Sequence, residues 1–246
     1  IILEKSKYLR EIQKKKLQNC EVKWLDNLKN INNLPCIFIA NEFFDALPIK
    51  QFIKKKNVWH ERYVKFSNSL KSKYLDIPFD IKKLEEKIKF KVSLKQNFIE
   101  YSPLALKYLK DITNKINLNN GGILIVDYGY LDKKMKNTIQ AVSKHKYTNI
   151  LNSFRNADIT YNLSFNFISQ IIKKMGSFFQ VTTTQKKFLI KLGILKRAEI
   201  LSRNIPFSKK ADMYFRIKRL IDEKQMGNLF KVTLITNKKC KFKLGF

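Results

Sequence analysis

The sequence contains little cysteine, little histidine and no long apolar run, and each shortage excludes a class of protein. The three cysteines are widely separated, no CxxC pair occurs, and two histidines are present. Cysteines in this number and spacing are typical of reduced thiols, so we expect neither a disulfide framework nor a zinc site, and no metal. Because no apolar run approaches the roughly 18 residues that a transmembrane helix requires, no membrane span is predicted.

Arginine is also scarce, although the chain is strongly basic. Only seven of its 50 basic residues are arginine, and with 20 acidic residues the formal net charge is +30. A charge of this size attracts phosphates and is typical of proteins that bind nucleic acids. However, lysine is spread along the whole chain and accompanies much asparagine, isoleucine and phenylalanine, which is the bias of an AT-rich genome. We therefore interpret the lysines mainly as solvated surface and do not favour nucleic acid as a partner.

The length and the first residues bound the domain organisation. A chain of 246 residues that is 44% hydrophobic can bury the core of one large domain. It begins with Ile-Ile-Leu-Glu, which contains neither an initiator methionine nor a leader and resembles the middle of a strand. We therefore expect an N-terminally incomplete chain that forms a single domain over 1–246, with residues 67–120 as an insertion or cap within it.

Apolar runs that alternate with helical spacing predict an open α/β sheet. The runs at 36–40 and 122–126 are apolar on both faces, as are strands of a parallel sheet that helices cover. A hairpin is predicted from 49–53 and 58–66, which flank a polar turn. Further strands are expected at 1–3, 21–25, 178–182 and 230–235, and helices at 7–16, 103–116, 165–175, 188–200 and 213–221.

Polar side chains follow three of the predicted strands. Glu4 follows the first strand, Asn41 and Glu42 follow the run at 36–40, and Asp127 follows the next apolar run. Ligands of open α/β sheets bind beyond the carboxyl ends of the strands, so these four residues are candidate site residues. A carboxylate such as Glu4 is also favoured near the start of a helix by the helix dipole, which is the alternative interpretation.

The stretch IANEFFDALP, at 39–48, concentrates polar and aromatic residues at one strand end. Three polar side chains lie within five residues, beside Phe43 and Phe44, and Pro48 restrains the exit of the segment. This pattern favours a cleft with the two phenylalanines in its wall over a turn with ordinary packing aromatics.

His60, Glu61 and Arg62 lie on the predicted hairpin, where neighbouring residues point to opposite faces of a strand. His60 and Arg62 therefore share one face, and Glu61 points to the other. From this spacing alone, a surface ion pair is the favoured interpretation. His145 has no acid or nucleophile partner in the pattern and is given no catalytic role.

Segments along nearly the whole chain resemble the MidA-like methyltransferases, a family that includes the mitochondrial complex I assembly factor that methylates arginine, and bacterial relatives. The segments are LEKSKYLREIQKKKL (3–17), NEFFDALPIKQF (41–52), WHER (59–62), EYSP (100–103), GGILIVDYGY (121–130), NTIQAVSKHK (137–146), ADITYNLSF (157–165), TQKKFLIKLGILKR (184–197) and MGNLFKV (226–232). The resemblance implies a Rossmann-like class I methyltransferase sheet with helices on both faces, an inserted β-hairpin and a helical insertion. It also implies that the family's first strand and glycine-rich loop are missing here.

The resemblance implies S-adenosylmethionine as the methyl donor and gives each candidate residue a side. On the donor side, Glu4 would hold the ribose, Trp24 and Asp26 would border the adenine, and Asn41 and Glu42 would lie near the transferable methyl. On the acceptor side it implies Asp127, Tyr128 and Gly129, together with Phe43, Phe44, His60 and Arg62.

The implied substrate is a protein arginine. A guanidinium group is cationic and a poor nucleophile, so carboxylates must orient it and take up its proton. Glu42, Asp45 and Glu61 are the candidate catalytic residues, with Glu42 first. Two other functions stay open: a non-catalytic assembly or binding protein on the same fold, which would not bind the donor, and a nucleic-acid methyltransferase or binder, whose binding would fall steeply with salt.

The genome bias favours a bacterial cytoplasmic protein, whereas a eukaryotic source would place the protein in the mitochondrial matrix.

Overall fold

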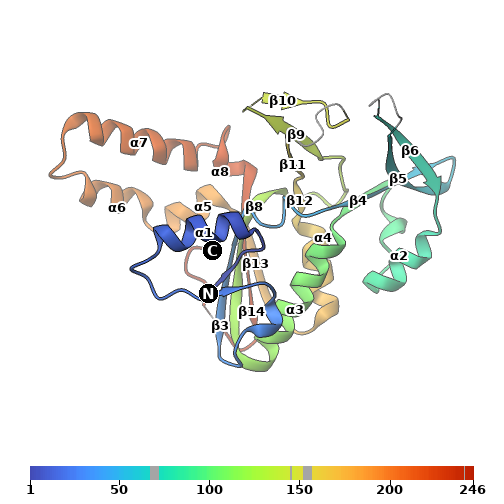
Figure 1. The fold of residues 1–246 in the computed structure, drawn as a ribbon, viewed down its shortest axis with the longest axis horizontal. Helices are drawn as coiled ribbons and strands as arrows, with labels where there is room; N and C mark the ends of the chain where they lie inside the picture. The colour runs from blue at the N-terminus through green and yellow to red at the C-terminus, as the bar shows by residue number, and fades with distance from the viewer. Residues whose placement is uncertain (67–71, 145, 152–156, 241) are drawn as a thin grey trace.

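A central mixed sheet with helices packed against it dominates the computed structural model, which describes residues 1–66, 72–144, 146–151, 157–240 and 242–246 (Figure 1). Five of the described strands form this main sheet: β3 (Cys36–Asn41), β8 (Gly121–Tyr130), β12 (Leu163–Ser164), β13 (Phe178–Thr184) and β14 (Phe230–Asn237). β8 pairs in parallel with β3 and β12, and antiparallel with β14, which in turn pairs with β13.

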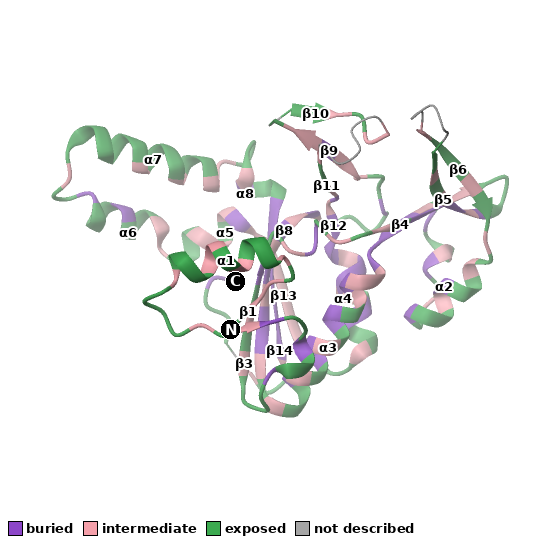
Figure 2. Cartoon of the chain, in the orientation of Figure 1, coloured by how far each residue is buried: buried purple, intermediate pink, exposed green. Residues whose placement is uncertain are grey.

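Two helices, α3 (Pro103–Asn119) and α4 (Phe165–Met175), pack with the main sheet to form the larger core. Ile123 and Ile125 of β8 and Ile235 of β14 have no exposed surface, and Figure 2 shows buried residues along these strands. Each large apolar side chain that is buried in this way contributes about 1.5–3 kcal/mol to stability. The apolar runs at 36–40 and 122–126 are thus confirmed as the strands β3 and β8, of which β8 is the more deeply buried.

The first two strands form a separate parallel pair. β1 (Ile2–Leu3) and β2 (Trp24–Leu25) are joined by α1 (Lys7–Lys16), and the short helix η1 (Leu28–Asn30) follows. Among the described strands, β3 pairs only with β8, and its Ile37 and Ile39 are 82% and 74% exposed. Among the described strands, the edge of β3 that faces away from β8 is therefore unpaired.

A second, antiparallel sheet has the order β6-β5-β4-β7, formed by β4 (Lys50–Lys55), β5 (Val58–Phe66), β6 (Ser72–Pro78) and β7 (Phe98–Tyr101). The hairpin predicted between β4 and β5 is confirmed, and Lys56 and Asn57 at its tip have φ of 44° and 65°, as a tight hairpin turn of the I′ type requires. Residues 67–71 lie outside the described part of the chain.

The small helices α2 (Ile81–Ile88) and η2 (Val92–Leu94) share an apolar cluster with this second sheet. β6 and β7 pair with strands that precede residue 67, whereas α3 packs on the main sheet. The predicted insertion at 67–120 therefore does not coincide with one packing unit, and the single domain over 1–246 stays a prediction.

A third small sheet, which the sequence pattern did not predict, contains β9 (Gln140–Ser143), β10 (Lys146–Thr148) and β11 (Asp158–Thr160). Four helices separate β13 from β14: α5 (Gln185–Lys191), α6 (Ile194–Leu201), α7 (Phe207–Ile221) and α8 (Met226–Leu229). The single helix predicted over 188–200 is wrong, because Gly193 takes a left-handed φ of 80° and separates α5 from α6. α6 and α7 project from the main sheet as a helical hairpin (Figure 1).

Candidate active site

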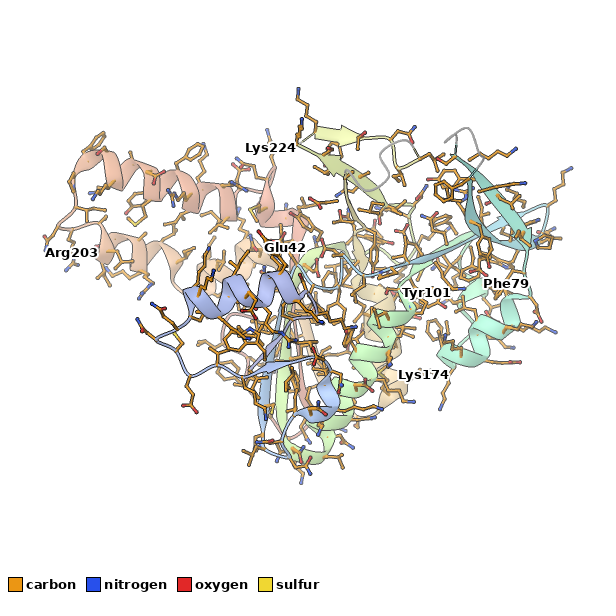
Figure 3. All side chains as sticks on the ribbon, viewed as in Figure 1. Glu42, Phe79, Tyr101, Lys174, Arg203 and Lys224 are labelled. Atoms are coloured by element: carbon orange, nitrogen blue, oxygen red, sulfur yellow. The ribbon has the colours of Figure 1, made fainter. Side chains whose placement is uncertain are left out.

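The segment after β3 holds Glu42 in a conformation that few residues other than glycine adopt. Its φ is 46°, and its N–H donates to the carbonyl oxygen of Val126 on β8 at 3.0 Å. This left-handed conformation costs a non-glycine residue on the order of 1 kcal/mol, and such strain gathers at functional sites. Asn41 and Glu42 are both exposed, and Figure 3 labels Glu42 at the upper end of the main sheet. Asn41 and Glu42 therefore lie at the carboxyl end of β3, as the sequence predicts.

Asp127 ties this segment to the end of β8. Its Oδ2 accepts hydrogen bonds from the N–H groups of Phe44 at 3.0 Å and Asp45 at 3.4 Å, and its Oδ1 accepts one from the N–H of Tyr128 at 2.9 Å. Burial, followed by the charge of Asp45, raises the pKa of Asp127 to about 7 in spite of these hydrogen bonds. Because its side chain has no exposed surface, Asp127 positions the segment from within the protein, and the acceptor-side role that the resemblance implies for it stays a prediction.

Asp45 is the second member of a buried carboxyl pair. Asp45 is 4% exposed, and its Oδ1 has no hydrogen-bond partner among the described residues. Burial, followed by the charge of Glu42, raises the pKa of Asp45 to about 6. A buried acceptor without a partner costs about 1–3 kcal/mol. This oxygen can therefore receive a donor group or a proton from a bound molecule at near-neutral pH.

Two tyrosines surround the carboxyl pair. Tyr128 packs its ring on Phe230, with centroids 4.1 Å apart, and burial followed by the charges of Glu42 and Asp45 raises its pKa. Tyr161 is buried, and its N–H donates to the carbonyl oxygen of Asp45 at 3.2 Å. Burial, and then the charge of Asp127, raises the pKa of Tyr161 far above its usual range. Both phenols therefore stay protonated at neutral pH; Tyr161 was not predicted, although it lies in one of the segments that carry the resemblance.

The residues expected on the donor side meet at the ends of β1 and β2. Glu4 Oε1 accepts a hydrogen bond from the N–H of Ser6 at 2.8 Å, and its Oε2 accepts one from Gln13 Nε2 at 3.1 Å. Gln13 Oε1 in turn accepts from Trp24 Nε1 at 2.9 Å. Gln13, which the sequence reasoning missed, therefore links the two predicted residues.

Asp26 joins the same cluster through Arg10. One guanidinium nitrogen of Arg10 donates to Asp26 Oδ1 at 2.6 Å and to the carbonyl oxygen of Glu4 at 2.5 Å. The Asp26 side chain is 76% exposed, so it lies at the rim of the cluster. Arg10 and Gln13 stand three residues apart on α1, and this helical spacing, which puts both on one face, was the signal that could have identified them.

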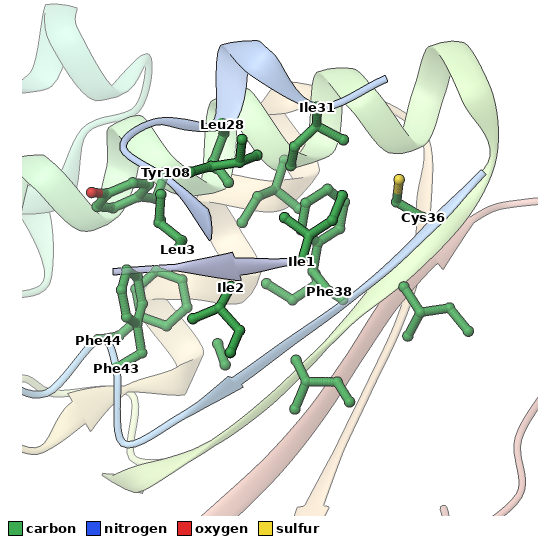
Figure 4. Close-up of a pocket in the computed structure, with 16 residues that line it drawn as sticks. Ile1, Ile2, Leu3, Leu28, Ile31, Cys36, Phe38, Phe43, Phe44 and Tyr108 are labelled. Carbon is green, nitrogen blue, oxygen red and sulfur yellow. The ribbon is translucent and has the colours of Figure 1, made fainter. Parts of the chain in front are cut away.

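Phe43 and Phe44 pack against the core behind the segment. Phe44 has no exposed surface, and Phe43 contacts the rings of Phe44 and Tyr108 edge-on, with centroids 5.2 Å apart in each pair. Both phenylalanines line an apolar cavity of about 430 Å³ between β1, β3 and α3 (Figure 4). None of the described residues that line this cavity is charged. The two rings therefore wall an apolar space, and Glu42 and Asp45 provide the polar side of the segment.

The structure places the 60–62 triplet in the second sheet. Glu61 is buried and pairs with Lys50, with Oε1 and Nζ 2.6 Å apart. Arg62 donates to both carboxylate oxygens of Asp76, at 2.9 and 3.1 Å, and this pairing lowers the pKa of Asp76 to about 2. Nδ1 of His60 lies 3.2 Å from the carbonyl oxygen of Val58. No described contact joins these three residues to Glu42 or Asp45, so their site roles stay predictions, and His145 lies outside the described residues.

Two other buried polar residues near the strand ends, Glu100 and Lys231, form hydrogen bonds within the protein. Glu100 accepts from Gln51 Nε2 at 2.6 Å and from the Thr138 hydroxyl at 2.5 Å. Lys231 Nζ donates to the carbonyl oxygens of Gly129, at 3.0 Å, and Asn228. A Cβ at Gly129 would lie 2.4 Å from the carbonyl oxygen of Leu163. Gly129 is therefore required for the close approach of β12 to β8, and its implied role on the acceptor side stays a prediction.

Metal-ligand clusters and membrane-spanning helices are absent from the described residues. No group of three or more histidine, cysteine, aspartate or glutamate side chains there can hold a metal ion. No helix within the same residues is long and apolar enough to cross a membrane.

Comparisons with known proteins identify the family of the chain. The model of a family described as "Putative S-adenosyl-L-methionine-dependent methyltransferase" matches residues 1–183. The mitochondrial protein arginine methyltransferase NDUFAF7 of Xenopus laevis is 28% identical over 211 residues, which are 85% of this chain and 47% of that protein. The NDUFAF7 homolog of Caenorhabditis elegans is 30% identical over 183 residues, which are 69% of this chain and 41% of the homolog. The chain thus spans about half the length of the curated relatives it matches.

A solved structure shares the fold. A Burkholderia thailandensis protein bound to S-adenosyl-homocysteine superposes with a TM-score of 0.80 at 21% identity, covering 100% of this chain and 65% of that one. This confirms the predicted Rossmann-like class I methyltransferase fold. Since the family model covers most of the chain, the chain belongs to this family of S-adenosyl-L-methionine-dependent methyltransferases, as its resemblance to the MidA-like proteins predicted.

Proposed function

We propose that the protein transfers a methyl group from S-adenosylmethionine to an arginine side chain of another protein. Two clusters at neighbouring carboxyl strand ends support this: Glu4, Gln13 and Trp24 beside β1 and β2, and Glu42 and Asp45 after β3. The main supporting observation is the Oδ1 of buried Asp45, which has no hydrogen-bond partner among the described residues. A buried acceptor of this kind is stabilised when a bound molecule donates a hydrogen bond to it. The relatives are named protein arginine methyltransferases, and the structural neighbour holds S-adenosyl-homocysteine.

The donor cluster fits a ribose and an adenine. Glu4 is a carboxylate at the end of a parallel strand, where it can accept hydrogen bonds from the two adjacent hydroxyls of a ribose. For this, the hydrogen bond from Gln13 Nε2 to Glu4 Oε2 has to break. Trp24 stands next to it and offers an apolar ring face to a base. When bound, S-adenosylmethionine supplies an electrophilic methyl group on a sulfonium sulfur.

The acceptor cluster fits a guanidinium group. Glu42 is exposed and Asp45 carries a free acceptor oxygen, so together they can accept hydrogen bonds from two N–H groups of a planar cation. As the N–CH₃ bond forms and the S–CH₃ bond breaks, the attacking nitrogen gives up a proton. Asp45, with a pKa of about 6, can take up that proton at neutral pH. Asp127 and its three amide contacts hold the segment in place during this step.

The setting of the enzyme is part of the proposal. The named relatives are mitochondrial, and the mitochondrial matrix is the corresponding compartment if the source is eukaryotic. The lysine and asparagine bias favours a bacterial cytoplasm. A role linked to the assembly of respiratory complex I, or a bacterial equivalent, follows from the resemblance to the assembly factor.

Donor binding and methyl transfer test the proposal separately. We expect the natural full-length protein to bind S-adenosyl-homocysteine in a calorimetric titration, and Glu4→Gln to weaken this binding about tenfold or more. With tritiated S-adenosylmethionine and an arginine peptide, Glu42→Gln should lower the rate of transfer on the order of 100-fold while donor binding stays within about threefold. Glu86→Gln, on the exposed side of α2, is the matched control and should change neither.

Three outcomes would contradict the proposal in different ways. Transfer at the full rate by Glu42→Gln would remove Glu42 from the acceptor site. Failure of the wild-type protein to bind S-adenosyl-homocysteine would favour a non-catalytic assembly protein on the same fold. Transfer to RNA or DNA in place of the peptide would favour a nucleic-acid methyltransferase.

A further inference from the structure

The hairpin of α6 and α7 forms an arm, residues 194–221, that extends away from the sheet (Figure 1). α7 packs against α5, α6 and α8 through partly buried residues, and no residue of α7 is fully buried. α8 in turn contacts β8, whose carboxyl end carries Asp127. The arm is therefore a largely exposed surface that is connected to the strand end of the candidate active site.

Arginine is concentrated in this arm. Four of the seven arginines of the chain lie within it: Arg197, Arg203, Arg216 and Arg219. The arm has eight basic and two acidic residues, and within the described residues Arg197 and Arg219 form no ion pair. The lysine bias of the whole chain does not explain a cluster of arginine. Arginine is the residue that pairs bidentately with carboxylates and is enriched at protein interfaces.

Large apolar side chains lie exposed among these arginines. Phe207 and Phe215 on α7 are 84% and 71% exposed, and Leu195, Ile200 and Leu201 on α6 are each exposed by about half. Lys218 and Arg219 follow Phe215 by three and four residues, so helical spacing places all three on one face. An exposed aromatic ring that is flanked by cations is typical of the anchor residues of protein interfaces.

From this combination we propose that the arm docks an acidic, partly apolar face of the protein that carries the acceptor arginine. The inference rests on the proposed function and names the surface that selects the substrate. A second copy of the chain is not favoured as the occupant, because two arms with the same excess of positive charge repel each other. Exposed aliphatic side chains on α6 give a nucleic acid neither a stacking surface nor a hydrogen bond, whereas they fit a protein surface.

Charge reversal on the arm tests the proposal. The experiment uses the natural full-length protein, tritiated S-adenosylmethionine and a lysate from the source organism that lacks the enzyme. We expect Arg197→Glu/Arg219→Glu to lower the methylation of lysate proteins about tenfold or more. Methylation of a short arginine peptide and binding of S-adenosyl-homocysteine should stay within about twofold, because the peptide does not reach the arm. The methylated proteins, once identified, should have acidic surfaces.

A matched control separates the arm from the general charge of the protein. Lys82→Glu/Lys83→Glu makes the same change of charge on the exposed side of α2, at the opposite end of the molecule in Figure 1, and should leave protein methylation nearly unchanged. Equal losses in both double variants would show that only net charge matters and would overturn the docking role.

The remaining outcomes are also decisive. Full protein methylation by the arm variant overturns the inference and leaves the proposed function intact. If the wild-type protein neither methylates the peptide nor binds S-adenosyl-homocysteine, both the docking inference and the proposed function are wrong. Binding of a 20-nucleotide RNA by the wild type that the arm variant loses, together with unchanged protein methylation, would assign the arm to nucleic acid instead.

Discussion

Asp45 and Asp127 share a buried site at the end of β3, so their charges oppose each other in the folded chain. The pKa of each carboxyl lies above its usual value of 3.8, at about 6 for Asp45 and about 7 for Asp127, chiefly because of burial. The folded state therefore binds these protons more tightly than the unfolded state does. The stability that this pair contributes is complete below about pH 4 and is lost as the pH rises through 6 and 7.

This sign leads to a prediction for Asp45→Asn. Removing the charge of Asp45 leaves Asp127 without its carboxylate neighbour. Between pH 5 and pH 8, the free energy of unfolding should therefore fall less in the variant than in the wild type. The difference between the two decreases should be on the order of 1–2 kcal/mol. Urea unfolding at the two pH values measures this difference. Asp158→Asn, at an exposed position, should keep the wild-type dependence. An unchanged slope in Asp45→Asn would show that Asp45 neither has a raised pKa in the folded protein nor raises the pKa of Asp127.

At the scale of the element, the first residues of α3 pack behind the candidate site. Ser102 is buried, and its Oγ accepts a hydrogen bond from the N–H of Ala105 at 3.1 Å. The same hydroxyl lies beside the phenol of Tyr161, which in turn contacts the backbone of Asp45. One serine thus caps a helix and takes part in the packing behind the carboxyl pair.

We expect Ser102→Ala to lower the free energy of unfolding by about 1–2 kcal/mol, because a buried helix N–H loses its acceptor. Ser6→Ala removes the equivalent N-cap of α1, where Ser6 accepts from the N–H of Leu9 at an exposed position. Water can replace that acceptor, so the expected cost is about 0.5 kcal/mol. Equal costs in denaturant unfolding would contradict the role given to burial.

At the scale of the whole molecule, the main sheet presents an uncovered apolar edge. Ile37 and Ile39 of β3 are mostly exposed, and β3 pairs on one side only among the described strands. Exposed apolar strand edges invite association between chains. The net charge of +30 opposes such association at low salt, and salt screens this protection.

Ile37→Thr/Ile39→Thr tests whether the face of β3 that carries these two side chains is exposed to solvent. Because both side chains are exposed, we expect the free energy of unfolding to change by no more than about 0.5 kcal/mol for each residue, while light scattering at 0.5 M salt decreases. Ile123→Thr/Ile125→Thr, in the buried core of β8, is the contrasting variant and should destabilise the chain by several kcal/mol. A large loss of stability in the first variant would mean that another part of the molecule covers the face.

Local patterns were sufficient for much of the fold. The apolar runs of β3 and β8, the hairpin of β4 and β5 and the capped helices α1 and α3 were predicted because each is specified by residues near it in the chain. The polar strand ends were predicted for the same reason, since an acidic residue directly after an apolar run is visible in the sequence. The break at Gly193 was missed because apolar spacing continues across it, and only its left-handed φ ends the helix.

The chemistry of the candidate site depends on contacts that no local pattern contains. Asp45 and Asp127 stand 82 residues apart, and their raised pKa values arise only when the sheet brings β3 beside β8 and excludes water. The hydrogen bonds of Gln13 to Glu4 and Trp24 also form only in the folded chain. The exposure of the arginines of the arm likewise depends on how α6 and α7 pack and cannot be read from the sequence. The residue types and their strand ends therefore come from the sequence. Which of them meet, which are buried and which stay exposed was decided by tertiary packing, because burial and long-range pairing are properties of the folded chain.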